Sequence, residues 1–274
     1  MPSLAELRPK VATFLRNAGV DDAARETSYL LSIALNASRA DLLVDRDLSA
    51  MEEAKINMLA ARRAAGEPLD RIRGTREFYG LNFGLNEATL SPRADTEALV
   101  ELVLEEAPEN ARLLDLGTGT GCILLTLLHN MRDARGTGVD ISDKALVQAQ
   151  QNARGLEIDA DFIQSDWFEN VSGTFDVIVS NPPYVRTQDI GALQTEVRDH
   201  DPHAALDGGA DGLDAYKTIF ANAQKFLNDG GMVAVEIGQG QTDDVVKIAS
   251  DNGFILRTQK ADLAGINRAL LFGF

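Results

Sequence analysis

Apolar residues recur at two different spacings along the chain, and the spacing changes near residue 75. Over residues 1–74 they fall three or four positions apart, alanine is abundant and β-branched runs are scarce, which favours helices throughout. Ser3 with Glu6, and Ser49 with Glu52, have the spacing of a capping box and predict two helix starts. Further helices are expected at residues 22–35 and 39–43, with a break at Gly66 and Pro68. We therefore expect a small N-terminal helical bundle.

Aromatic residues and glycines then alternate at short intervals from Arg76 to Leu90, in a stretch that includes Glu77-Phe78-Tyr79-Gly80-Leu81. Strand-forming residues separated by glycine are typical of a β-hairpin. We assign residues 75–90 to a hairpin linker between two domains.

Short apolar runs alternate with helical patterns in residues 91–274. This alternation predicts an α/β domain with a mostly parallel sheet, helices on both faces and a ligand site at the carboxyl ends of the strands. Strands are expected at residues 113–116, 136–139, 160–163, 175–179, 232–237, 254–258 and 269–272.

The composition is that of a globular protein. Of the 274 residues 45% are hydrophobic, which is enough for a sizeable core, and no run approaches the roughly 20 apolar residues of a membrane span. The N-terminal residues lack the basic start and apolar run of a secretory signal. The single cysteine, Cys122, can form no internal disulfide. We expect a cytoplasmic protein that does not enter a membrane.

The net charge bears on the choice of partners. With 26 basic and 42 acidic residues the formal charge is −16. Such a surface repels phosphate backbones, so long nucleic acid is not expected as a direct partner, whereas a basic or RNA-bound protein suits it. The acidity is equally compatible with a surface that is charged only for solubility.

A glycine-rich turn follows the first strand of the α/β domain. Leu113-Leu114-Asp115-Leu116 runs into Gly117-Thr118-Gly119-Thr120-Gly121, after which a helix is expected. Glycines let the backbone turn sharply and let a ligand approach where a Cβ would collide. The dinucleotide fingerprint G-x-G-x-x-G would need glycine at the position of Cys122. The run therefore indicates a nucleotide-type cofactor site of a kind common in methyltransferases; the alternative is a tight turn without a ligand.

Acidic and aromatic residues follow the next two strands. The carboxylate of Asp140 can accept hydrogen bonds from both hydroxyls of a ribose. A helix N-cap is the alternative role for Asp140, although Ser142 is better placed for it. Asp166 can accept from an adenine amino group, and Trp167 can cover the ring or simply pack in the core. Together these residues suggest an adenosine site.

Asn181-Pro182-Pro183-Tyr184, directly after the fourth strand, carries the candidate chemistry. The two prolines fix φ and remove two backbone donors, so the loop presents acceptors. A carboxamide nitrogen is a poor nucleophile and has to be oriented. The Asn181 side-chain oxygen and the Pro182 carbonyl can each accept one of its N–H groups, which aims the lone pair at a sulfonium-borne methyl group. The Tyr184 ring can pack over the plane of the amide, and its electron-rich face can stabilise the positively charged methyl group nearby. The alternative is a proline-stiffened loop with a packed tyrosine.

No metal site is expected. His200 and His203 are three residues apart, as two ligands on a helix can be, but Pro202 lies between them and no third ligand is apparent. We interpret both histidines as loop residues.

Over nearly its whole length the chain resembles the HemK/PrmC family of protein-(glutamine-N5) methyltransferases. The resemblance rests on the motifs above and on further short segments, which are Glu77 to Leu81, Ser91-Pro92-Arg93 with Thr96-Glu97, Pro202 with Ala205-Leu206, Gly208-Gly209 with Asp211-Gly212-Leu213, and Glu236-Ile237-Gly238 with Gln241.

This resemblance implies a helical domain at residues 1–74 that engages the substrate, joined by the hairpin to a Rossmann-like, seven-stranded class I methyltransferase domain at residues 91–274. It implies S-adenosylmethionine as the cofactor and a glutamine held by Asn181 to Tyr184. The implied substrate is the glutamine of the Gly-Gly-Gln motif of class I peptide-chain release factors, which act in translation termination. The implied cofactor contacts are Gly117 to Gly121, Asp140, Trp167 and Asn181.

One segment departs from the family pattern of proline-arginine-proline-glutamate-threonine-glutamate. Here Arg93-Ala94-Asp95-Thr96-Glu97 lacks the second proline and carries a shorter acid. Because Arg93 and Glu97 are retained, we still expect the segment to border the cofactor pocket.

Three alternative functions remain open. A glutamine methyltransferase of a ribosomal protein is a close relative of the family, and the sequence does not choose between the two substrates. An adenine or cytosine N-methyltransferase would use the same four residues, because its amino group is also conjugated to a planar π system, but it would have to flip a base and hold phosphates. A protein that senses the cofactor without reacting would bind it and transfer no methyl group.

Overall fold

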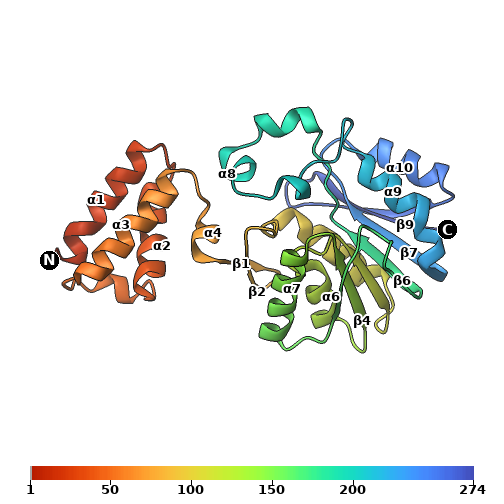
Figure 1. Cartoon of the computed structure of the whole chain (residues 1–274), viewed down its shortest axis with the longest axis horizontal. Helices are drawn as coiled ribbons and strands as arrows, with labels where there is room; N and C mark the ends of the chain where they lie inside the picture. Colours follow the sequence, from red (N-terminus) through yellow and green to blue (C-terminus); the bar gives the residue numbers. More distant parts are fainter. Residues whose placement is uncertain (1) are drawn as a thin grey trace. The chain divides into compact units, whose positions relative to one another are not determined.

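The computed structural model describes residues 2–274. The chain forms two compact units, one of residues 2–74 with Thr195–His200, the other of Thr75–Gln194 with Asp201–Phe274 (Figure 1). None of the helices formed by the described residues is both long and apolar enough to cross a bilayer.

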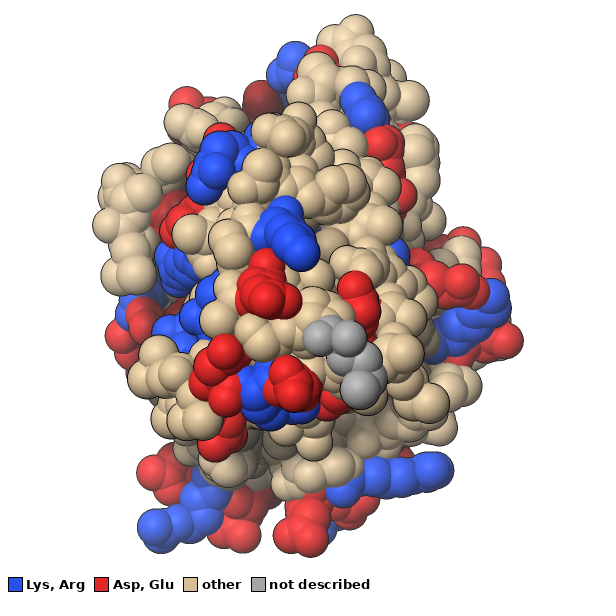
Figure 2. All heavy atoms as spheres, turned by 90° about the vertical axis from the view of Figure 1, so that its left-hand side faces the viewer, with Lys and Arg blue, Asp and Glu red and all other residues tan. Residues whose placement is uncertain are grey.

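The first unit is a bundle of short helices around a leucine-rich core. Both expected capping boxes are present, since Ser3 and Ser49 each accept the N–H of the glutamate three residues on, whose side chain returns to the cap backbone. On the face in Figure 2, basic and acidic side chains are interspersed with uncharged surface. The helices are α1 (Leu4–Asn17), α2 (Ala23–Leu35), η1 (Asp41–Leu43), α3 (Ala50–Ala64), α4 (Leu69–Arg73) and α8 (Thr195–Arg198).

A two-stranded hairpin opens the second unit. Strands β1 (Thr75–Phe78) and β2 (Leu81–Gly84) pair in antiparallel fashion, and their phenylalanines, Phe78 and Phe83, are buried in the core of this unit. The hairpin is shorter than expected and ends at Gly84. Asn86 then forms a turn in which its Oδ1 accepts the N–H of Ala88 at 2.9 Å, and this turn replaces strand pairing.

A seven-stranded sheet forms the centre of the second unit, in the order β5-β4-β3-β6-β7-β9-β8. Only β9 runs against its neighbours, so the expectation of a mostly parallel, seven-stranded α/β fold is confirmed. The strands are β3 (Arg112–Leu116), β4 (Arg135–Asp140), β5 (Asp161–Gln164), β6 (Phe175–Ser180), β7 (Leu227–Glu236), β8 (Ile255–Ala261) and β9 (Asn267–Gly273).

Alternating residues of the central strands face two separate apolar layers. Leu113, Val177 and Val179 belong to one buried cluster, which α5 (Glu97–Glu106) and α6 (Cys122–Asn130) complete. Leu114 and Ile178 belong to the other, against α9 (Asp214–Ala223) and α10 (Thr242–Asp251). Strands covered on both faces read as continuous apolar runs, which is why the sequence reveals them. The remaining helical segments of this unit are α7 (Asp143–Leu156), η2 (Ala94–Thr96), η3 (Thr187–Ala192), η4 (His203–Ala205) and η5 (Gln224–Phe226).

The strand order reverses at β3. From β3 the chain builds outward through β4 to β5, and then returns to the other side of β3 to lay down β6 and β7. Connections that leave a parallel sheet in opposite directions open a crevice at the carboxyl ends of the strands. The ends of β3, β4 and β6 are therefore the place where a ligand site is expected.

Candidate active site

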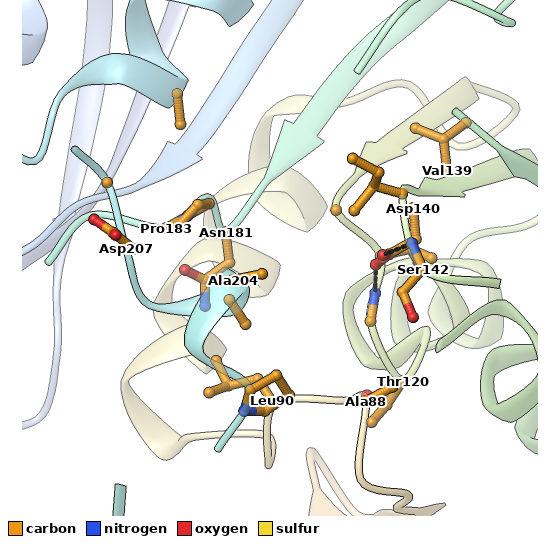
Figure 3. A pocket seen from close by; sticks show the side chains of 18 of the residues that line it. Ala88, Leu90, Thr120, Val139, Asp140, Ser142, Asn181, Pro183, Ala204 and Asp207 are labelled. Carbon is orange, nitrogen blue, oxygen red and sulfur yellow. Dashed lines mark hydrogen bonds between the residues drawn. The ribbon is translucent and has the colours of Figure 1, made fainter. Parts of the chain in front are cut away.

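A pocket of about 900 Å³ opens at this switch point, and all of its lining residues belong to the second unit. Figure 3 shows Asp140, at the end of β4, and Asn181, directly after β6, on opposite sides of it. The lining is completed by segments around residues 88–96, 117–123, 139–142, 165–167, 202–209 and 214–218.

The glycine-rich turn after β3 lines the pocket with Gly117, Thr118, Gly119 and Thr120. The N–H groups of Gly117 and Thr118 both donate to the carbonyl of Val139, each at 2.9 Å, which ties the turn to β4. Gly117 and Gly119 have positive φ, a conformation that glycine adopts without strain. Gly121 also has positive φ but does not line the pocket; it caps α6.

The carboxylate of Asp140 is held by backbone donors. One oxygen accepts the N–H of Gly119 and the other that of Ser142, both at 2.9 Å (Figure 3). Burial raises the pKa of Asp140, and these backbone N–H groups oppose that rise. Ser142 is the N-cap of α7, as expected, since its hydroxyl accepts the N–H of Ala145. Asp140 thus faces the pocket with two fixed oxygens that keep lone pairs for a ligand.

Trp167 lies at the pocket beside Asp166, in an unusual backbone conformation. Its φ is +48°, which costs energy for a bulky side chain. The Ser165 hydroxyl donates to the Trp167 carbonyl at 2.9 Å and accepts the N–H of Asn170 at 3.0 Å, so a local bonding pattern supports this turn. The indole is half-buried and borders the pocket, whereas Asp166 is exposed.

The loop after β6 is packed against three glycines. A Cβ on Gly208 would lie 2.7 Å from the Pro183 carbonyl oxygen, and one on Gly212 would lie 2.5 Å from that of Tyr184. A Cβ on Gly238 would approach the Tyr184 ring to 3.0 Å. These close approaches require glycine at positions 208, 212 and 238, which belong to the segments that resemble the HemK/PrmC family.

Gln241 forms hydrogen bonds to the loop after β6, to Gly212 and to Gly238. Its amide nitrogen donates to the carbonyls of Tyr184 at 3.1 Å and Gly212 at 3.2 Å, and its amide oxygen accepts the N–H of Gly238 at 2.9 Å. The loop is therefore fixed from two sides, by close packing and by a bonded side chain.

Of the four residues expected to act in catalysis, Asn181 and Pro183 line the pocket, whereas Pro182 and Tyr184 are not among the lining residues. Pro182 is buried. The Tyr184 hydroxyl donates to Glu236 Oε1 at 3.3 Å, and burial together with that carboxylate raises the pKa of Tyr184 to about 12. Tyr184 is therefore protonated at neutral pH. Roles for the Pro182 carbonyl and the Tyr184 ring stay predictions.

The segment that departs from the family pattern does border the pocket, at Arg93 and Thr96. Glu97 instead accepts the N–H of Tyr79 at 3.1 Å and helps to hold the hairpin. Arg93 lies 3.4 Å from a carboxylate oxygen of Asp201, which supplies the counter-charge.

Sequence reasoning assigned no role to two buried acids close to these residues, Asp115 and Glu236. Neither side chain is exposed, and burial raises the pKa of each to about 7. A signal was available, because Asp115 follows the apolar pair Leu113-Leu114 and Glu236 follows the apolar run from Met232 to Val235, and an acid in such a run is rarely buried without a purpose.

Among the described residues no group of three or more His, Cys, Asp or Glu side chains is arranged to hold a metal ion. His200 lies in a turn, and His203 begins η4 and lines the pocket.

Two protein-family models match the chain. Residues 93–199 match the methyltransferase small domain, and residues 6–74 match the PrmC N-terminal domain.

Three similar proteins carry the name release factor glutamine methyltransferase. The protein from Agrobacterium fabrum is 46% identical over 268 residues, covering 94% of this chain and 93% of its own. Those from Bradyrhizobium diazoefficiens and Geobacter sulfurreducens are each 44% identical, covering 98% and 94% of this chain and 94% and 92% of their own.

Solved structures resemble the fold at low identity. A methyltransferase from Pyrococcus furiosus superposes with a TM-score of 0.55 at 17% identity, covering 72% of this chain and 90% of its own. The tRNA m1G37 methyltransferase of M. jannaschii gives 0.52 at 14% identity, covering 73% and 56%. At these identities the likeness extends to the fold alone.

Proposed function

The chain belongs to the family of release factor glutamine methyltransferases, and from that premise we propose that it methylates a side-chain amide nitrogen, N5 of a glutamine, in a peptide-chain release factor. The methyl donor is S-adenosylmethionine. The acceptor is the glutamine of the Gly-Gly-Gln motif of a class I release factor. The observation that carries the proposal is one pocket bordered by both the glycine-rich turn with Asp140 and the Asn181 loop.

The residues of the pocket fit this cofactor. Both Asp140 oxygens are fixed by backbone N–H groups and keep lone pairs that can accept from two ribose hydroxyls. A Cβ at Gly117 would meet nothing within 4 Å, so the turn leaves open space beside its backbone. Trp167 would cover the adenine, and Asp166 would accept from its amino group.

When bound, S-adenosylmethionine supplies an electrophilic methyl group on a sulfonium. The task of the chain is to present the acceptor nitrogen, whose lone pair is delocalised into its own carbonyl. Asn181 Oδ1 would accept one N–H of the glutamine amide and the Pro182 carbonyl the other, which turns the lone pair toward the donor. Holding two reactants in reactive geometry supplies most of the rate enhancement that such a reaction needs.

Two other acceptors are outcomes of the same test. A net charge of −16 disfavours duplex DNA or RNA, and the interspersed charges on the face in Figure 2 offer no continuous basic track there. A glutamine of a ribosomal protein presents the same amide, so direct competition is required to separate it from a release factor.

The test offers the protein a labelled methyl donor with purified release factor, ribosomal proteins or duplex DNA, and maps the label by mass spectrometry. We expect the label on the release factor, at the glutamine of its Gly-Gly-Gln motif. A release factor with that glutamine changed to alanine is the control and should remain unlabelled. Preferential labelling of DNA or of a ribosomal protein would contradict the proposal.

A further inference from the structure

Glu236 ends β7 directly behind the Asn181 loop, and its side chain is completely buried. Its Oε1 accepts the Tyr184 hydroxyl at 3.3 Å, and its backbone carbonyl accepts the Tyr216 hydroxyl at 2.8 Å. The Thr96 side chain also interacts with the carboxyl group and lowers its pKa. The carboxyl group of Glu236 is thus bonded to the Tyr184 hydroxyl and lies close to Thr96, which lines the pocket.

Thr96 connects this carboxylate to Asn181. The Asn181 Nδ2 donates to Thr96 Oγ1 at 3.2 Å, and Thr96 is almost fully buried. A hydroxyl that accepts from an amide has one proton of its own left to donate. The buried carboxyl group of Glu236, whose pKa the Thr96 side chain lowers, is the neighbouring acceptor for that proton. With Nδ2 occupied in this way, the Oδ1 of Asn181 is the end of the amide that is left for an acceptor substrate.

Stability does not explain a carboxylate at this place. Burial raises its pKa to about 7, opposed by Thr96, Arg93, Tyr184 and Arg268, and its Oε2 has no hydrogen-bond partner among the described residues. A buried acceptor without a partner is unfavourable, and apolar replacement of buried charges is often neutral or stabilising.

We propose that Glu236 is a positioning residue for methyl transfer, acting through two hydroxyl groups. By receiving the Thr96 proton it keeps Thr96 Oγ1 as an acceptor, which fixes the Asn181 amide with Oδ1 toward the substrate. By receiving the Tyr184 proton it fixes the ring next to that amide. This role rests on the proposed function, because it orients the group that would hold the glutamine.

The test compares four single variants by the single-turnover rate of methyl transfer, donor affinity and melting temperature. Glu236→Gln and Thr96→Val should each lower the rate at least about tenfold, with donor affinity changed less than about threefold, because misorientation of one group costs rate more than binding. Thr96→Ser keeps the hydroxyl and should stay within about threefold of the wild type. Thr126→Val is the matched control, since Thr126 is buried in α6 with an unbonded hydroxyl and does not line the pocket. It should leave the rate unchanged.

A double variant separates a shared pathway from two independent effects. If Glu236 acts through Thr96, Glu236→Gln with Thr96→Val should lose about as much as the more damaging single change, because interacting sites are not additive. Independent structural damage would instead multiply the two losses and lower the melting temperature in parallel.

The inference is overturned if Glu236→Gln keeps the wild-type rate, if Thr96→Ser is as slow as Thr96→Val, or if the two losses multiply. The positioning role of Glu236 can be wrong while the proposed function is right, and the reverse also holds. Should the wild type methylate another acceptor in preference to a release factor, the proposed function fails, and the same variants assayed on that acceptor still decide the role of Glu236.

Discussion

Three acidic side chains near the pocket have three different environments. Asp140 accepts two backbone N–H groups. Asp115 accepts the Thr118 hydroxyl at 2.6 Å, and its Oδ1 has no hydrogen-bond partner among the described residues. Glu236 accepts the Tyr184 hydroxyl and interacts with Thr96. Burial raises the pKa of each, most clearly for Asp115 and Glu236, at about 7. The charges of Asp115 and Glu236, which are buried and do not line the pocket, are therefore sensitive to pH near neutrality.

Asp115 should make the stability of the fold depend on pH. Its pKa rises from 3.8 to about 7 on folding, so the folded state binds the proton more tightly than the unfolded state. The stability contributed by protonated Asp115 is fully present below pH 4 and is lost as the pH rises to about 7. Asp115→Asn, which cannot ionise and can still accept from Thr118, removes this dependence.

Calorimetry of the wild type and of Asp115→Asn at pH 5 and pH 8 checks this directly. We expect the variant to gain on the wild type by at least about 2 °C in melting temperature between the two pH values. An equal difference at both pH values would show that Asp115 is already ionised in the fold.

Local motifs made part of the pocket predictable at the scale of residues. Gly117 and Asn181 directly follow β3 and β6, Asp140 ends β4, and Trp167 lies three residues beyond β5. The carboxyl ends of parallel strands meet at one edge, which brings these residues together. The Thr96 hydroxyl and the Glu236 carboxylate could not be predicted in the same way, because their partners lie far away in sequence and meet only in the folded sheet.

At the scale of elements, the Asn181 loop depends on two segments that follow it in sequence. Residues 206–212 pair with it, since the Val185 N–H donates to the Leu206 carbonyl at 2.9 Å and the Gly208 N–H to the Val185 carbonyl at 2.8 Å. Gln241 holds it from the other side. A loop constrained in this way can keep Asn181 in place before any ligand arrives.

A methyl group added to this packing should be costly. Gly208→Ala would place its Cβ 2.7 Å from the Pro183 carbonyl oxygen and 2.9 Å from the Tyr184 Cα, so the backbone of the loop must move. We expect the methylation rate to fall at least about tenfold, since a small displacement of a positioned group has large effects on rate.

Gly155→Ala is the matched control for this change. Gly155 lies in α7, and an added Cβ would meet nothing within 4 Å. Activity should be unchanged, and stability should rise by roughly 0.5–1 kcal/mol because alanine favours a helix. Equal activity of both variants would contradict the account of the loop.

Regular elements were more predictable from sequence than the segments between them. All seven strands of the sheet were expected, because burial on both faces makes them apolar runs. The stretch from η3 to η4 carries no such pattern, and nothing in it indicated that α8 packs with the helical unit. Its fold depends on tertiary contacts, such as Glu196 with Arg63, which sequence periodicity does not encode.

At the scale of the whole molecule, the first unit includes one short segment from much later in the sequence, Thr195–His200. Arg63, only 8% exposed, pairs with Glu26 of α2 and, at 2.6 Å, with Glu196 of α8, so one buried cation joins α8 to α2. The chain then runs directly from His200 into Pro202 and His203, which line the pocket. Covalent continuity thus links the helical unit to the pocket wall.

We propose that the helical domain, residues 1–74, engages the release factor. Removal of residues 1–74 should slow methylation of both a whole release factor and a short glutamine peptide, and the loss should be at least about tenfold larger for the release factor. The reason is that docking on a remote surface accelerates only substrates that carry the docking surface. The peptide rate reports any damage caused by leaving α8 without its partners. Equal losses on both substrates would remove the docking role.

The central claim is that Asn181 orients the acceptor amide within the glycine-lined pocket. The most direct test is the single-turnover rate of methyl transfer to a release factor by Asn181→Ala, measured beside donor affinity and beside Asn222→Ala, a control on α9 outside the pocket lining. We predict a loss of at least about a hundredfold for Asn181→Ala with the fold and donor binding retained, and no loss for the control. Retention of most of the wild-type rate by Asn181→Ala would contradict the account.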